Sequence, residues 1–163
     1  MKNRFRFSRL LRSITLFPIF VILYSCEPIA NHFDDVEEAI MYRSSTIKDF
    51  PSKKTIKVMT WNIRFGVARA DFFGDGCGDR VVFTKDEVTA ALESLAKKIN
   101  LEDPDILLLQ EVDVQSKKTA YIDQAQWLLN NTNLNYGAYA SMWEAQVILA
   151  DGLGRVNTGN LIL

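Results

Sequence analysis

The order of the predicted elements favours an α/β fold, in which helices pack as a layer on a sheet. Two stretches with the composition of strands, Thr55–Ile63 and Ile106–Val112, flank a stretch of helical periodicity that begins after Thr84. Strand, loop, amphipathic helix and strand in succession form a βαβ-like unit. With 163 residues, 48% of them hydrophobic and 24% charged, the chain is long enough for one domain with a core.

Residues 1–25 are interpreted as a lipoprotein signal peptide. Five bases precede the apolar run Ile14–Tyr24, which is too short to span a bilayer and has the length of a signal-peptide core. The run ends in Leu23-Tyr24-Ser25-Cys26. This tetrapeptide resembles the lipobox of bacterial lipoproteins, which implies cleavage before Cys26 and a lipid on its sulfur. We therefore expect the protein in the bacterial cell envelope; an uncleaved anchor and an ordinary secretory signal are the alternatives.

Residues 26–53 are expected to be a tether, with a short helix over Asp34–Tyr42 and a domain boundary near Ser52. His32, the only histidine, lies in this tether. Subtracting the five N-terminal bases from the 19 in the chain leaves 14 bases against 20 acids, a net charge of −6. This acidity disfavours strong general binding to nucleic acid, because the phosphate backbone attracts basic surfaces.

The domain, residues 54–163, is expected to begin with the strand Thr55–Ile63, since valine, isoleucine, threonine and tryptophan favour strands. The glycine-rich stretch Asp71–Arg80 is interpreted as a loop, which is a lid, an edge of the substrate site or a plain surface connection. It contains Cys77, the only cysteine besides Cys26, so no disulfide is expected within the mature domain. We interpret Cys77 as an inert loop thiol.

The helix between the two strands has a defined start. Thr84-Lys85-Asp86-Glu87 is a capping box, in which a hydroxyl and a carboxylate satisfy free amides of the first turn. Apolar residues then recur at spacings of three and four as far as Ile99, which predicts one buried face. Lys97 and Lys98 are expected to close the helix, where its dipole favours positive charge. Asp103-Pro104 is expected to turn the chain into the next strand.

The second strand turns abruptly polar at its end, with Gln110, Glu111 and Asp113. Because side chains alternate along a strand, Glu111 and Asp113 are expected on one side and Gln110 on the other. Two neighbouring acids at the rim of a sheet would suit a hard divalent cation such as Mg²⁺. A strand that ends in a solvated polar turn is the alternative interpretation.

The remaining stretches predict one more helix and two strands. Apolar residues from Tyr121 to Leu129 indicate a helix that ends at Asn130–Asn133, and Tyr136–Trp143 alternates loosely, as a strand does. Asp151–Arg155 is interpreted as a glycine-containing loop before a strand at Gly159–Leu163. The last apolar run is unfinished, so the chain is expected to be a fragment.

Three of these stretches, in this order, resemble the endonuclease/exonuclease/phosphatase superfamily, which has the deoxyribonuclease-I-like fold. They are Val58–Arg64, Asp105–Val112 and Gly159–Leu163, and the resemblance spans residues 55–163. It implies a sandwich of two sheets flanked by helices, of which this chain would be the N-terminal portion, truncated in the second half. It also implies that Glu111 is a magnesium ligand and that Asn62 lies beside the metal and the scissile phosphate. Both are therefore candidate catalytic and metal residues, with Arg64, Asp113 and Asn160 as candidate neighbours.

The resemblance implies a metal-dependent phosphoesterase that acts on phosphodiesters or phosphomonoesters with Mg²⁺ or Mn²⁺. A carboxylate-held cation neutralises charge on the phosphate while a base activates water. The family's patterns for that base, Gly-Asp-x-Asn and Ser-Asp-His, do not occur in these 163 residues, and His32 matches no family position. The chain as given is therefore expected to be inactive. The alternative is a lipid-anchored binding or assembly module without the chemistry; substrate and oligomeric state are not predicted.

Overall fold

The computed structural model describes residues 30–34, 36–49, 52, 54–75, 78–148 and 150–163. The expected signal peptide, Cys26 and Cys77 lie outside these residues. None of the helices in the described part is long and apolar enough to cross a membrane.

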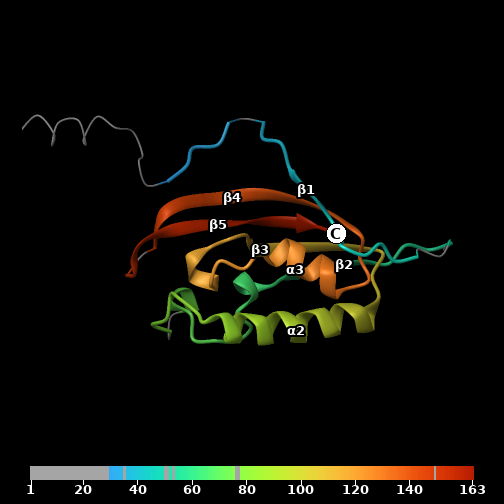
Figure 1. Ribbon diagram of the computed structural model, residues 1–163, viewed down its shortest axis with the longest axis horizontal. Helices are drawn as coiled ribbons and strands as arrows, with labels where there is room; N and C mark the ends of the chain where they lie inside the picture. The colour runs from blue at the N-terminus through green and yellow to red at the C-terminus, as the bar shows by residue number, and fades with distance from the viewer. Residues whose placement is uncertain (1–29, 35, 50–51, 53, 76–77, 149) are drawn as a thin grey trace, which may run out of the picture.

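Five strands form one mixed sheet in the order β1-β4-β5-β3-β2 (Figure 1). Their bounds are β1 Ile40–Arg43, β2 Val58–Asn62, β3 Ile106–Asp113, β4 Tyr136–Ile148 and β5 Gly152–Ile162. Strands β2 and β3 are parallel and are joined through a helix, whereas the other neighbours pair antiparallel. The predicted βαβ-like unit and the α/β class are confirmed. The second sheet that the resemblance implies is not among the described residues.

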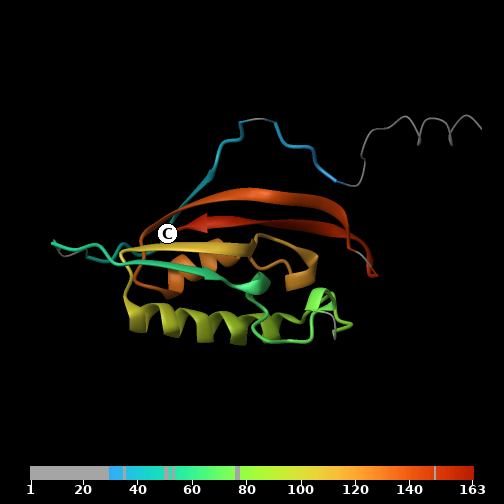
Figure 2. The ribbon, with the colours of Figure 1, turned by 180° about the vertical axis from the view of Figure 1, so that it is seen from behind.

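Two helices, α2 (Lys85–Glu102) and α3 (Gln124–Asn131), lie on one side of the sheet (Figures 1 and 2). The predicted capping box is present, because the Thr84 side chain accepts from the Glu87 amide and Glu87 accepts from the Thr84 amide at 2.9 Å. Short 3-10 helices occupy Arg64–Gly66 (η1), Phe73–Asp75 (η2) and Lys117–Thr119 (η3).

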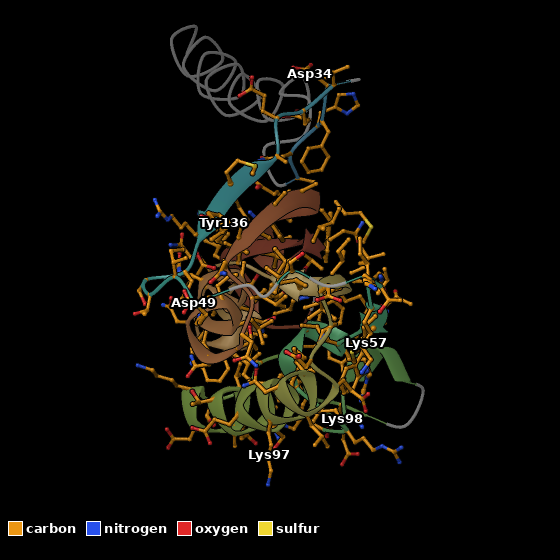
Figure 3. All side chains as sticks on the ribbon, turned by 90° about the vertical axis from the view of Figure 1, so that its right-hand side faces the viewer. Asp34, Asp49, Lys57, Lys97, Lys98 and Tyr136 are labelled. Atoms are coloured by element: carbon orange, nitrogen blue, oxygen red, sulfur yellow. The ribbon has the colours of Figure 1, made fainter. Side chains whose placement is uncertain are left out.

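Helix α2 continues four residues past Lys98, so the prediction that Lys97 and Lys98 close it is wrong. Lys97 lies on the side of α2 that is turned away from the sheet and Lys98 lies at its flank (Figure 3), where Lys98 pairs with Glu102 at 2.6 Å. The helix ends where Asp103 adopts a left-handed conformation with φ 46°. Pro104 follows and cannot donate a helical hydrogen bond, which agrees with the predicted turn.

The predicted short helix over Asp34–Tyr42 is wrong, because Ile40–Arg43 forms β1 and pairs antiparallel with β4. The chain meets β4 even earlier: Ala30 forms a bridge with Ala145. Asn31 then donates from its backbone to the Glu144 carbonyl at 2.9 Å and from its side chain to the Glu144 carboxylate at 2.6 Å. Residues N-terminal to the expected boundary therefore belong to the sheet, an arrangement that local composition does not signal.

The expected loop at Asp151–Arg155 is largely strand. Strand β4 extends to Ile148 and β5 begins at Gly152, whose φ is +80°. The two long strands thus form a hairpin with a much shorter turn than the glycines suggest, because cross-strand hydrogen bonds continue through them. Gly154 and Arg155 lie within β5.

The two faces of the sheet differ in burial. The face under the helices carries the core, where Leu92, Leu107, Leu109, Tyr139 and Leu161 are at most 1% exposed. On the other face, the strand registers place Met41, Ala138, Ile162, Leu108 and Thr60 in one cross-strand row. Met41 and Ile162 in this row are 74% and 52% exposed. None of the described helices covers this open face (Figures 1 and 2).

Candidate functional site

Asn62 and Glu111 meet at the ends of the two parallel strands. Strands β2 and β3 pair in register as far as Asn62 and Gln110, so β2 ends beside Gln110, close to the end of β3 at Asp113. The Asn62 side-chain amide donates to Glu111 Oε1 at 2.8 Å. Asn62 is exposed and Glu111 is partly buried. The pair therefore lies at the C-terminal rim of the strands, where open α/β sheets bind their ligands.

A β-bulge places Glu111 at this rim. Leu109 pairs with Leu161 and Val112 pairs with Gly159, so Gln110 and Glu111 together oppose the single residue Asn160. Glu111 has φ 56°, a left-handed conformation that a glutamate rarely adopts and that is costly in free energy. Asn160 is exposed on β5 beside the bulge. Three neighbouring strands thus bring Asn62, Glu111 and Asn160 to one rim.

The bulge also changes the side-chain directions that strict alternation along β3 predicts. Gln110 donates to Thr60 Oγ1 at 3.1 Å and Glu111 accepts from Asn62. Since Thr60 and Asn62 lie on the same face of β2, the expectation that Gln110 and Glu111 point to opposite sides is wrong. The extra residue of the bulge interrupts the alternation of period two.

Asp113 does not stand beside Glu111 at the rim but is fully buried. Its carboxylate accepts from Thr158 at 2.6 Å and Thr119 at 2.9 Å, and it lies 3.2 Å from the Lys118 ammonium. Burial raises the pKa of Asp113, which Lys118 opposes, and burial lowers the pKa of Lys118. The expected pair of neighbouring acids at the surface is therefore wrong: the second acid lies in the interior, paired with Lys118.

Arg64 lies in the 3-10 turn η1 that follows β2. Its backbone amide donates to Asn62 Oδ1 at 2.9 Å, which fixes the Asn62 side chain. Its guanidinium donates to the carbonyls of Ala68 and Ala70 in the same loop. Arg64 thus holds the loop that leaves β2, next to the Asn62–Glu111 pair.

Two residues around the site were not singled out in the sequence. Lys118 is 5% exposed and lies over the Phe65 ring, with its nitrogen 3.3 Å from the ring centroid. Gln124 is fully buried at the start of α3. Lysine and glutamine are usually exposed, so nothing in the local sequence distinguishes these two from surface residues.

A pocket of about 610 Å³ opens next to Asn62, between η1 and helix α2. Asn62, Arg64, Arg69 and Ser94 contribute its polar lining. Arg69 is exposed. An anionic group at the rim would therefore have basic side chains within the adjoining pocket.

The residues at the rim fit a hard cation. Mg²⁺ is commonly held by one or two carboxylates, with waters and substrate phosphates completing its ligands. Glu111 supplies a carboxylate, and Asn62 and Asn160 supply amide groups on either side of it. Among the described residues there is no group of three or more His, Cys, Asp or Glu side chains that could hold a metal. The fit is thus to a cation bound largely through Glu111.

Comparison with known proteins agrees with this geometry. Residues 59–162, more than half of the chain, match the model of the Endonuclease/Exonuclease/phosphatase family. The match includes β3, β5 and all of β2 except Val58, the strands that carry Glu111, Asn160 and Asn62. No curated protein and no solved structure matches the chain. The chain belongs to the Endonuclease/Exonuclease/phosphatase family.

Proposed function

We propose that this protein is a Mg²⁺- or Mn²⁺-dependent hydrolase of phosphate esters, held at the bacterial cell envelope by a lipid on Cys26. Members of the family are hydrolases that act on phosphate esters and typically use divalent metal ions. The observation that carries the proposal is the Asn62–Glu111 pair, 2.8 Å apart at the rim of the parallel strands.

Each residue at the rim has a chemical role in this proposal. Glu111 holds the cation through its carboxylate, the ligand type that hard cations prefer. Asn62, oriented by the Arg64 amide, and Asn160 offer amide N–H groups to phosphate oxygens. A bound cation would neutralise charge on the phosphate and polarise it.

The test replaces Glu111 by glutamine in the full-length gene product, which keeps the shape and removes the charge. We expect hydrolysis of a generic phosphodiester with Mg²⁺ or Mn²⁺ to fall by orders of magnitude, with partial recovery at high Mg²⁺. Glu93→Gln is the matched control, since Glu93 is exposed on α2 and should leave activity unchanged. Ordinary activity in Glu111→Gln, or activity undiminished by excess chelator, would refute the metal role.

A second part of the proposal is that residues 26–163 alone form an incomplete site. The exposed apolar side chains of the open face, such as Met41 and Ile162, support it, because surfaces of this kind are usually covered. This segment, purified alone, should be poorly soluble and hydrolyse no phosphodiester above background. Metal-dependent turnover that Glu111→Ala abolishes would contradict this part.

The lipid anchor is tested separately from the chemistry. We expect the wild-type protein to partition into detergent and with membranes, and Cys26→Ala to release it or to leave the precursor uncleaved. A Cys26→Ala protein with unchanged processing and fractionation would overturn the anchor and leave the hydrolase proposal intact. Parallel assays on nucleic acid, phospholipid and sugar phosphate would identify the substrate class.

A further inference from the structure

The two segments that carry Asn62 and Glu111 both have costly backbone conformations. After β2, Arg64 and Phe65 have φ values of 47° and 57°, and Glu111 in β3 has φ 56°. Left-handed conformations of non-glycine residues persist only where the surroundings hold them. A specific set of contacts must therefore maintain both segments.

The Gln124 side chain makes one hydrogen bond to each segment. Its Oε1 accepts from the Asp113 backbone amide at 3.0 Å, two residues after Glu111. Its Nε2 donates to the Phe65 carbonyl at 2.6 Å, in the turn after β2. A Cβ on Gly66 would lie 2.7 Å from Gln124 Nε2, so glycine at this position allows the glutamine to reach the carbonyl. Gln124 thus bridges the exits of β2 and β3.

Lys118 joins the same two segments a second time. Its ammonium lies 3.3 Å from the centroid of the Phe65 ring and 3.2 Å from Asp113 Oδ1. Phe65 and Asp113 are therefore connected both through Gln124 and through Lys118, in a closed ring of contacts. A ring resists relative displacement better than one bond, because neither segment can shift without breaking two contacts.

We propose that Gln124 is a positioning residue that sets the spacing between Asn62 and Glu111. The inference rests on the proposed function of this pair as the phosphate and metal site. Asn62 is tied to the Phe65 segment by the Arg64 amide and to Glu111 by its own amide. Holding Phe65 against Asp113 therefore holds Asn62 against Glu111. Gln124 touches neither the expected cation nor the phosphate and acts only through the backbone.

The test compares two glutamines of helix α3 in the full-length gene product. Gln124→Leu removes both bridging hydrogen bonds at similar side-chain volume. Gln126→Leu is the matched control, because the Gln126 amide donates to Arg43 O and Asn130 Oδ1, away from the rim. Gln124→Met also removes both hydrogen bonds and keeps the unbranched shape of the side chain. It serves if Gln124→Leu does not fold.

Three measurements separate positioning from a general loss of stability. Gln124→Leu should weaken Mn²⁺ binding, measured by calorimetry, by about 10- to 100-fold, as the loss of groups that orient metal ligands commonly does. It should lower kcat by a similar factor with KM little changed, and it should shift the Asn62 side-chain amide signals in a ¹H–¹⁵N spectrum. Gln126→Leu should lower the unfolding temperature without any of these changes.

The outcomes distinguish this inference from the proposed function. A wild-type protein that neither binds Mn²⁺ nor hydrolyses phosphate esters would overturn the proposed function. The Asn62 amide signals would then still decide whether Gln124 positions the pair. Unchanged Asn62 signals in Gln124→Leu, or equal changes in Gln126→Leu, would overturn the positioning role. Unchanged Mn²⁺ affinity in Gln124→Leu, beside a wild type that binds Mn²⁺, would also overturn it.

Discussion

Gly159→Ala, which adds one methyl group in the middle of the sheet, should destabilise the fold strongly. Gly159 lies in the central strand β5, paired with Ser141 of β4 on one side and Val112 of β3 on the other. A Cβ built there would lie deep inside van der Waals contact with the Ala140 carbonyl oxygen and 2.9 Å from Ser141 Cα. Both are backbone atoms, which cannot turn aside as a side chain does. The strands would therefore have to separate beside the bulge that carries Glu111.

The size of the expected loss of stability follows from these contacts. Overpacking costs roughly 1–3 kcal/mol, and a clash with backbone belongs at the upper end. Alanine also restricts the backbone of the unfolded chain, which offsets only about 0.4–1 kcal/mol of this cost. We expect a net destabilisation of about 2–3 kcal/mol, which for a domain of this size lowers the unfolding temperature by roughly 4–12 °C. Thermal and urea unfolding, followed by tryptophan fluorescence, measure it.

Gly137→Ala is the matched control for this reasoning. Its Cβ would lie 2.6 Å from Leu163 Cδ2, the far end of a side chain that can change rotamer, and its nearest backbone contact, with Ile162 O, would be a milder 3.2 Å. We expect a smaller cost, about 1 kcal/mol. Equal destabilisation by the two substitutions would show that the distinction between backbone and side-chain contacts is mistaken. A Gly159→Ala protein as stable as wild type would refute the close approach of β4 and β5.

Two further predictions concern buried and capping charges. Lys118→Met leaves the Asp113 carboxylate buried without its cation and should lower the free energy of unfolding by about 3–5 kcal/mol. Adding Asp113→Asn should recover part of this loss. Equal stabilities of the single and double variants in urea unfolding would contradict the prediction. Hydrogen bonds from Arg80 and Thr84 lower the pKa of Glu87 to about 2, so its contribution to stability is present above pH 4.5 and is lost as pH falls towards 2. Glu87→Gln should flatten this part of the pH–stability profile, and a profile identical to wild type would argue against the capping role.

The parts of the fold that local sequence signals determine were predicted well. The Thr84–Glu87 capping box marks the start of α2, since it acts within four residues. The apolar run after Pro104 predicts β3, and the polar residues at the end of this run identify Glu111 as a candidate site residue. The proximity of Asn62 and Glu111 follows from two strand ends only if the strands are parallel neighbours. The helix between them makes that arrangement expected.

The features that escaped prediction depend on contacts between distant segments. Nothing near Glu111 signals a bulge, because the left-handed position is occupied by a glutamate rather than a glycine. Strand β1 exists because its backbone pairs with β4, about one hundred residues later in the chain. Lys118 is buried because Asp113 and Thr158 provide partners for its ammonium. The spacing of residues in sequence contains none of this information.

The bridge between Ala30 and Ala145 bears on where an anchored molecule would work. Ala30 follows the proposed lipid site Cys26 by four residues, a segment that spans at most about 14 Å when fully extended. Ala145 pairs with Val156, and the next residue of β5 accepts from the Val114 amide at the end of β3. Ala30 and the rim with Glu111 therefore lie toward the same end of the sheet. A lipid on Cys26 would confine that rim to a thin layer at the bilayer surface, where substrates are met by diffusion in two dimensions.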